Sequence, residues 1–214
     1  MNIKKEWLNF PHILHSSIFN ALSTAFLTVM YTYFLVNHLV ALRSYAVSPA
    51  VVVVIILESV AILLLIMRKQ PSLRAVSFPA WFFTITGTYA PLLLVPTGTT
   101  GALTQGNILI SIGGLLAIGA YLSLNSSFGL APALREVKTR GLYRIVRHPI
   151  YASYFFMYLG YVFLAFTLFN IVLVLTLFVC LLMRIHYEEL ILKTSSDYVL
   201  YTEKVRYRLI PSVY

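Results

Sequence analysis

The chain has 214 residues, of which 59% are hydrophobic and 11% are charged, and its mean hydropathy is +0.83. A soluble domain of this length could not bury so much apolar surface, so the composition excludes that class and predicts an integral membrane protein. The net charge of +9 comes from basic residues in short segments beside apolar runs. Such a distribution indicates contact with membrane lipids and not with nucleic acid.

Six apolar runs predict membrane-spanning helices. They cover residues 13–42, 47–67, 78–95, 108–124, 150–168 and 171–183. Residues 1–11 form an amphipathic lead that suits the membrane surface, and residues 97–107 are typical of a flexible loop. The last two runs leave room for only a turn at Asn170, which predicts a helical hairpin. The predicted fold class is therefore all-α: a multi-pass transmembrane protein of about six spans, ending in that hairpin and an amphipathic tail.

Proline and small residues add local detail. Pro49, Pro79 and Pro149 each stand where a helix is expected to begin, a position that tolerates the missing N–H group. The fourth predicted span carries small residues that would allow a neighbouring helix to approach closely. These are Gly113, Gly114, Ala117 and Ala120.

The distribution of Lys and Arg among the connecting segments predicts the topology. One side of the membrane would carry only Arg43. Because basic loops stay in the cytoplasm, we expect both termini to be cytoplasmic, in a plasma or inner membrane. The other side would carry Lys4 and Lys5; Arg68, Lys69 and Arg74; Arg135, Lys138, Arg140, Arg144 and Arg147; and Arg184, Lys193, Lys204, Arg206 and Arg208.

The segment Arg140–Tyr151 concentrates polar chemistry, with three arginines, one histidine and two tyrosines. It leads into an apolar run at Pro149, so the positive end of a helix dipole would face the residues before that proline. We expect a site for an anionic or mixed-charge ligand here, although the cations taken alone would also serve as a topology signal.

A second polar group follows the last apolar run. If that helix continues past the membrane surface, Arg184 and Glu188 lie four residues apart and share one face. They could form a simple ion pair, but the predicted hairpin brings them, with Glu189, back to the side where the helix at Pro149 begins. Acids would then hold a cation while arginines and N–H groups hold a carboxylate, which suits a zwitterionic ligand.

These motifs, together with the C-terminal segment, resemble a known family over residues 126–214. Gly141-Leu142-Tyr143 with Arg147-His148-Pro149-Ile150-Tyr151 is similar to the glycine-aromatic and arginine-histidine-proline signature of the isoprenylcysteine carboxyl methyltransferases. Glu188-Glu189 resembles the second motif of that family. The terminus, with Tyr198, Tyr201 and residues 205–211, resembles its tyrosine-rich Leu-Ile-Pro end. Phospholipid N-methyltransferases share related features.

The resemblance implies a membrane methyltransferase that uses S-adenosylmethionine and a lipophilic small-molecule or lipid-attached acceptor. Residues 1–124 would then be N-terminal membrane helices and residues 125–214 the methyltransferase core. Arg184, Glu188 and Glu189 are the candidate catalytic residues, with Arg184 on the substrate side. Arg135 departs from the histidine-type residue that the family usually has at that position. The implied cofactor contacts are Arg135, Glu136, Val137, Lys138, Tyr143, His148, Pro149, Ile150, Tyr151 and Glu188.

The chemistry of methyl transfer is compatible with these residues. Transfer from a sulfonium requires alignment and a dry pocket, and it needs no general base when the acceptor is already a carboxylate or thiolate. The rings of Tyr143 and Tyr151 can stabilise a sulfonium through cation–π contact. With an amine acceptor, His186 or Glu189 would be the candidate base. Carboxylate, thiol and amine acceptors all stay open at this point.

Several residues outside these motifs also allow predictions, and two alternative functions stay open. Glu58, near the middle of the second span, could line an acceptor path or be hydrogen-bonded to a neighbouring helix. His12, His15 and His38 lack metal-ligand spacing, so no metal is predicted, and Cys180 is interpreted as a packing residue. The alternative functions are an NADPH-dependent sterol-type reductase, which has a comparable arginine-histidine-proline stretch but more spans, and a non-catalytic lipid-binding protein.

Overall fold

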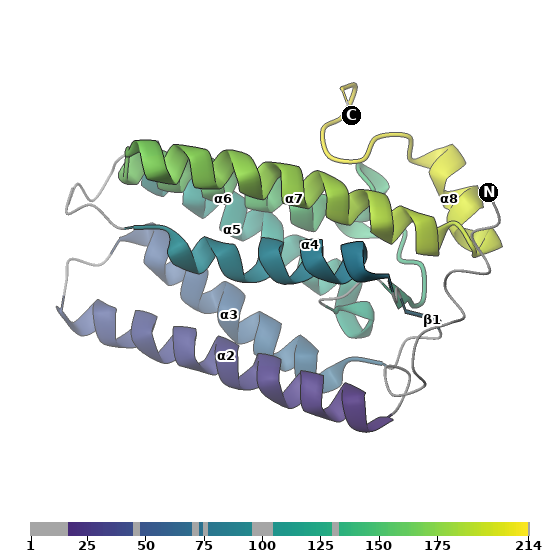
Figure 1. Cartoon of the computed structure of the whole chain (residues 1–214), viewed down its shortest axis with the longest axis horizontal. Helices are drawn as coiled ribbons and strands as arrows, with labels where there is room; N and C mark the ends of the chain where they lie inside the picture. The colour runs from purple at the N-terminus through teal and green to yellow at the C-terminus, as the bar shows by residue number, and fades with distance from the viewer. Residues whose placement is uncertain are drawn as a thin grey trace.

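The computed structural model describes residues 17–44, 48–69, 73–74, 77–95, 105–129 and 133–213. Its helices run side by side as a bundle, with α8 lying at one end (Figure 1). The all-α fold class is confirmed. The α-helices are α2 (Ser17–Ser44), α3 (Pro49–Met67), α4 (Phe78–Tyr89), α5 (Gln105–Leu124), α6 (Pro149–Leu164), α7 (Leu168–Leu192) and α8 (Ser196–Lys204). The 3-10 turns are η2 (Ala90–Leu93), η3 (Asn125–Ser127) and η4 (Gly141–Arg144).

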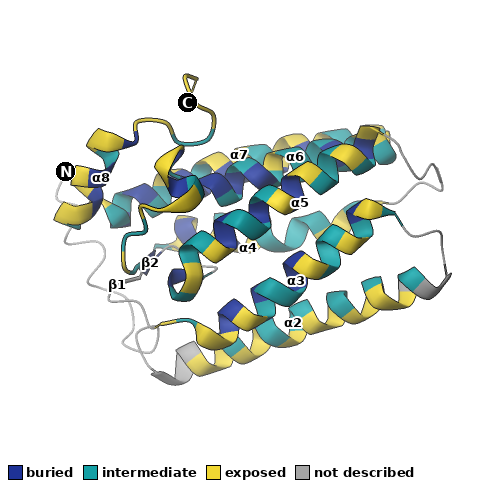
Figure 2. Ribbon diagram, turned by 180° about the vertical axis from the view of Figure 1, so that it is seen from behind, coloured by how far each residue is buried: buried dark blue, intermediate teal, exposed yellow. Residues whose placement is uncertain are grey.

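Three helices in the described part of the chain are long and apolar enough to cross a membrane: α3, α5 with its extension through Ser127, and α7. Helix α6 is apolar but shorter. Large apolar side chains such as Leu63, Leu115 and Leu175 are exposed on the three long helices, while buried residues face the inside of the bundle (Figure 2). A surface this rich in apolar groups requires a lipid surrounding. The prediction of a membrane protein is confirmed.

Helix starts follow the prolines and their caps. Helix α3 begins at Pro49, where the Ser48 side chain accepts a hydrogen bond from the N–H of Val51. Helix α6 begins at Pro149, as predicted. In α4, Pro79 occupies the first turn. Because proline lacks an N–H and has a helical φ, and because the serine side chain accepts one of the unpaired N–H groups, these residues fix where the helices begin.

Small residues let α5 and α6 approach closely. A Cβ atom added at Gly113 would lie 2.7 Å from the carbonyl oxygen of Ser153, and one added at Gly160 would lie 2.7 Å from the carbonyl oxygen of Gly106. Any larger residue would push the helices apart. The expectation that the glycines of this span serve helix contact is confirmed.

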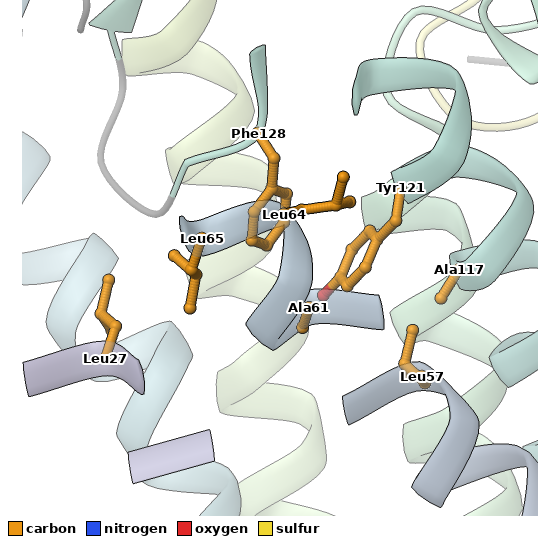
Figure 3. Close-up of a cluster of buried hydrophobic side chains, with 8 residues drawn as sticks. All are labelled: Leu27, Leu57, Ala61, Leu64, Leu65, Ala117, Tyr121 and Phe128. Carbon is orange, nitrogen blue, oxygen red and sulfur yellow. The ribbon is translucent and has the colours of Figure 1, made fainter. Parts of the chain in front are cut away.

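A buried cluster joins α2, α3 and α5 (Figure 3). The rings of Tyr121 on α5 and Phe128 lie 4.6 Å apart, centroid to centroid, and they pack against the side chains of α3. This cluster holds the N-terminal helices against the rest of the bundle. Its members are Leu27, Leu57, Ala61, Leu64, Leu65, Ala117, Tyr121 and Phe128.

Helices α6 and α7 are joined by residues 165–167, so the two runs are consecutive helices joined by a short turn, as predicted. The predicted position of the turn is wrong, because Asn170 lies in the first turn of α7. The buried amide of Asn170 donates to the carbonyl oxygens of Ala165 and Val95, at 2.8 and 2.9 Å. Helix α7 continues without a break to Leu192, so the predicted acidic motif lies on this helix. The predicted lead over residues 1–11 and most of the predicted loop lie outside the described residues, and α5 already begins at Gln105.

One small feature had no signal in the sequence. Strand β1 (Leu73–Arg74) pairs with strand β2 (Ala133–Leu134) in antiparallel register. The pair links the segment after α3 to the segment that leads towards η4. It therefore helps to hold that connecting segment at the end of the bundle where α8 lies (Figure 1).

Candidate functional site

The η4 turn places the first aromatic residue of the predicted motif. Gly141 has φ of +60°, and a Cβ atom there would overlap the side-chain oxygen of Ser123 on α5. Only glycine accepts both conditions without strain. The turn can then pack on the end of α5 and bury Tyr143, whose carbonyl oxygen accepts a 2.6 Å hydrogen bond from the hydroxyl of Tyr201. Burial raises the pKa of the Tyr143 phenol, so this ring stays neutral.

The C-terminal tail lies alongside the residues that precede α6. The N–H of Arg147 donates to the carbonyl oxygen of Tyr207 at 2.9 Å, and the N–H of His148 donates to that of Arg208 at 2.8 Å. These backbone bonds satisfy donors that precede the helix and have no partner within it. The predicted meeting of the arginine-histidine-proline segment and the tail is therefore direct.

Glu189 connects three segments at this junction. Its side chain is buried, at 2% exposure. One oxygen accepts from Nε of Arg147 at 2.8 Å and lies 3.4 Å from Nε2 of His148. The other accepts from Nε and Nη2 of Arg208, at 3.1 and 2.9 Å, and lies 3.5 Å from Nζ of Lys193. Surrounding cations offset the cost of burying this carboxylate.

A cavity lies beside His148, and its wall is built from segments far apart in the sequence. The end of α5, the connector before η4, η4 itself, and helices α6, α7 and α8 all contribute, together with one residue of α2. The lining residues are Tyr31, Leu124, Ser127, Phe128, Gly129, Ala133, Arg135, Glu136, Val137, Lys138, Tyr143, Arg147, His148, Ile150, Tyr151, Tyr154, Arg184, Glu188, Leu192, Tyr198 and Tyr201.

The structure brings most of the predicted site residues to this one cavity. Every predicted cofactor contact lines it except Pro149, which begins the helix behind His148. Arg184 and Glu188 line it as well, whereas Glu189 does not. What these residues bind stays a prediction, but their convergence around one hollow is a property of the fold.

Tyr151 joins the two charged residues of α7 within the cavity. Its hydroxyl donates a 2.7 Å hydrogen bond to a carboxylate oxygen of Glu188. The guanidinium carbon of Arg184 lies 5.2 Å from the centre of its ring, within the range of a cation–π contact. Nδ1 of His148 lies 4.0 Å from the same Glu188 oxygen. The site thus combines an acid, a stacked cation and an aromatic face.

A second pair of opposite charges lies on the connector. Nζ of Lys138 is 2.7 Å from a carboxylate oxygen of Glu136, and the ammonium lowers the pKa of that exposed carboxyl group. The cavity therefore carries positive and negative groups both on its exposed rim and deeper, where Arg184 is only 5% exposed. Such a distribution matches a ligand with charges of both signs.

Some lining residues were not predicted as contacts. Tyr198 and Tyr201 belong to the tyrosine-rich terminus, but the sequence assigned them no contact. The hydroxyl of Tyr198 is buried and has no hydrogen-bond partner among the described residues. A buried hydroxyl of this kind in a cavity wall is expected to meet a ligand or water. Tyr31 and Tyr154 lie on apolar helices, where no motif marked them.

The remaining candidates lie elsewhere. Glu58 is buried on α3, and one of its carboxylate oxygens is 3.1 Å from Nδ1 of His38 on α2, so its observed role is a hydrogen bond between helices. His186 is exposed and does not line the cavity. Cys180 is buried. Within the described ranges, His, Cys, Asp and Glu form no group arranged for a metal ion; His12 and His15 lie outside those ranges.

Comparison with known proteins identifies the segment that carries this site. No curated protein matches the chain. Residues 112–194 match the family model described as the isoprenylcysteine carboxyl methyltransferase family. The matched segment includes the connector, η4, α6 and the part of α7 with Arg184, Glu188 and Glu189. The resemblance predicted from the sequence is confirmed over this segment: residues 112–194 are similar to the isoprenylcysteine carboxyl methyltransferase family.

Proposed function

We propose that this protein is an integral membrane methyltransferase that transfers a methyl group from S-adenosylmethionine to a lipophilic or lipid-attached acceptor. The family match supports a methyltransferase over the reductase alternative. The observation that carries the proposal is the convergence of Tyr151, Arg184 and Glu188 in one cavity with the charged connector.

The donor set of the cavity fits S-adenosylmethionine. The cofactor carries an ammonium and a sulfonium as well as a carboxylate. Glu136 and Glu188 supply carboxylates for the cations, and Lys138 supplies a cation for the carboxylate. The buried hydroxyl of Tyr198, which has no partner among the described residues, offers a further polar contact. We therefore propose that these residues, with the aromatic faces of Tyr143 and Tyr151, hold the cofactor.

The residues of the chain would then position and shield the reaction. When bound, S-adenosylmethionine supplies an electrophilic methyl group on a sulfonium. The hydrogen bond from Tyr151 to Glu188 fixes the ring at the junction between the donor and acceptor sides. Arg184 docks the acceptor, and the tail paired with Arg147 and His148 limits access of water from the end of the bundle. Glu189 acts as a positioning residue that holds this tail.

The geometry favours an acceptor that is already an anion. Neither residue considered as a base for an amine acceptor lines the cavity: His186 is exposed, and Glu189 is engaged by two guanidinium groups. A carboxylate bound by guanidinium groups is a poor base. Arg184 is the cation deepest in the cavity wall, at 5% exposure. A carboxylate or thiolate acceptor would meet it and needs no proton removed.

We further propose that α2 to α7 cross the membrane, with the site end and both termini on the cytoplasmic side. The ends of α3 and α5 and the starts of α4 and α6 lie at one end of the bundle (Figure 1). Basic residues such as Lys69 and Arg147 flank those ends, as cytoplasmic loops do. Residues 1–124 would form the N-terminal helices and residues 125–214 the methyltransferase core.

Binding of radiolabelled S-adenosylmethionine to the purified protein in lipid nanodiscs tests this function. We expect wild-type protein to bind and Glu188→Ala to lose binding, because the substitution removes both a cavity carboxylate and the partner of Tyr151. Glu203→Ala, at an exposed site on α8, is the matched control and should bind normally.

Two outcomes would contradict the proposal in different ways. Retained binding in Glu188→Ala would remove the site assignment. Absence of binding in the wild type would remove the methyltransferase function itself. If the wild-type protein binds the cofactor, incubation of membranes with cofactor labelled in the methyl group will show which lipid, peptide or small molecule receives the label.

A further inference from the structure

One wall residue of the cavity precedes the family segment in the chain. Tyr31 lies on α2, while the matched segment begins at residue 112. On the α6 side the cavity is lined by Tyr154. The hydroxyl of Tyr154 is 2.7 Å from that of Tyr121 on α5, so these two hydroxyls are hydrogen-bonded to each other. Tyr31 packs against the buried cluster that contains Tyr121. Three helices thus contribute one tyrosine each to this part of the bundle.

Packing in the bundle holds Tyr121 in place. Tyr121 is 1% exposed and its ring packs against Phe128 and the side chains of α3 (Figure 3). It does not line the cavity. Its hydroxyl therefore fixes the position of the Tyr154 hydroxyl, while Tyr31 and Tyr154 stand where a ligand can meet them.

These tyrosines lie at the end of the cavity where Arg184 is found. The ring of Tyr154 is 6.4 Å from that of Tyr151, edge to face, and Arg184 covers the Tyr151 ring. The cavity therefore has a charged end at the connector and an inner end with one guanidinium and tyrosine hydroxyls.

Burying hydroxyl groups among apolar helices costs free energy unless they form hydrogen bonds. Each tyrosine hydroxyl has one hydrogen to donate and can also accept. Hydrogen bonds to Tyr121 can use at most two of the three hydrogens, so at least one donor is left over. That donor, beside a guanidinium, matches a group that carries negative charge on oxygen.

We propose that Tyr31 and Tyr154, the latter held in place by Tyr121, form the specificity-determining subsite for the head group of the methyl acceptor. The subsite takes the anionic oxygen group of an amphiphile: Arg184 neutralises the charge and a tyrosine hydroxyl donates a hydrogen bond to it. This inference rests on the proposed function and adds a division of labour. The family segment holds the cofactor, and α2 takes part in choosing the acceptor.

Acceptor binding and cofactor binding can be measured separately on the full chain in lipid nanodiscs. The acceptor probe is N-acetyl-S-farnesylcysteine, a lipophilic carboxylate of the kind that the family description indicates, and its methyl ester is the uncharged probe. Tyr31→Phe and Tyr154→Phe remove the hydroxyls and keep the rings. The matched control is Tyr33→Phe, on the same helix but 62% exposed.

We expect the dissociation constant for the carboxylate probe to rise about tenfold in at least one of Tyr31→Phe and Tyr154→Phe, as for loss of a hydrogen bond to a charged group. In turnover, KM for that probe should rise while kcat changes less than about threefold. Affinity for S-adenosylmethionine and for the methyl ester should match those of Tyr33→Phe. Removing the hydroxyl of a merely structural tyrosine would change the affinities for the carboxylate probe, the methyl ester and the cofactor together.

Two results would overturn the inference. One is a result that would assign the tyrosines to packing: either both variants keep wild-type affinity for the carboxylate probe, or they lose as much affinity for the cofactor as for that probe. The other is a wild-type protein that binds S-adenosylmethionine but not the carboxylate probe. Failure of the proposed function gives a distinct pattern, because wild-type protein would then not bind the cofactor.

Discussion

The two halves of the bundle differ in how their polar groups are held. In α6, α7 and the tail, ionic and backbone hydrogen bonds interlock around Glu189 and Tyr151. In α2 and α3, polar contacts include single side-chain hydrogen bonds between helices, such as that of Glu58 with His38. The difference indicates that geometry is fixed most firmly where we place the cofactor. The N-terminal helices contribute packing and a single wall residue.

The largest effect is expected where that interlocking is removed. Glu189→Ala would leave the buried guanidinium of Arg147 without its carboxylate and would release Arg208 of the tail. We expect a loss of about 3 kcal/mol in unfolding free energy, the usual cost of breaking a buried ion pair from one side. Thermal unfolding in detergent measures the loss, and limited proteolysis should show earlier cleavage of the tail.

Lys193 provides the control for this substitution. Its ammonium also lies near Glu189, but the side chain is about half exposed, so Lys193→Ala should cost less than about 1 kcal/mol. Equal effects of the two substitutions would show that the buried network is no stronger than a surface ion pair.

A smaller and more specific effect is expected from Tyr151→Phe. The ring and its contact with Arg184 stay, but the hydrogen bond to Glu188 is lost. Affinity for S-adenosylmethionine should fall about tenfold, because a hydrogen bond to a charged group is removed. Tyr161→Phe, near the other end of α6, should leave that affinity unchanged. If both variants bind alike, the Tyr151–Glu188 contact does not order the cofactor site.

The smallest effect is expected from Glu58→Gln in the N-terminal half. The amide oxygen can still accept from His38, so the unfolding free energy should change by less than about 1 kcal/mol. Affinities for cofactor and acceptor should not change. A weaker acceptor affinity, measured with the farnesylated probe, would instead place Glu58 on the acceptor path and blur the contrast between the halves.

Much of this architecture could be predicted because it depends on local signals. Apolar runs gave the helices, Pro149 gave the start of α6, and glycines such as Gly113 indicated close helix contact. The convergence of the connector and α7 was predicted only through the family motifs. Propensity alone does not bring distant segments together.

Other features depend on rotation and packing that a sequence pattern does not encode. Neighbouring helical residues point about 100° apart, so Glu188 and Glu189 look equivalent in the sequence. Yet only Glu188 lines the cavity. Tyr31 and Tyr154 are two of fifteen tyrosines, and their places in the cavity wall depend on how α2 and α6 pack in the bundle. The pairing of β1 with β2 involves only two residues on each strand.

The continuity of α7 has a consequence for the membrane setting. Arg184 and Glu188 stand four residues apart, so a rise of about 6 Å along one helix separates the groups assigned to acceptor and donor. The helix contains neither proline nor glycine, the residues at which helices most often kink. A thinner bilayer would tilt this rod as a whole, without changing the spacing along it. The reactive spacing would therefore be preserved across membranes of different lipid composition.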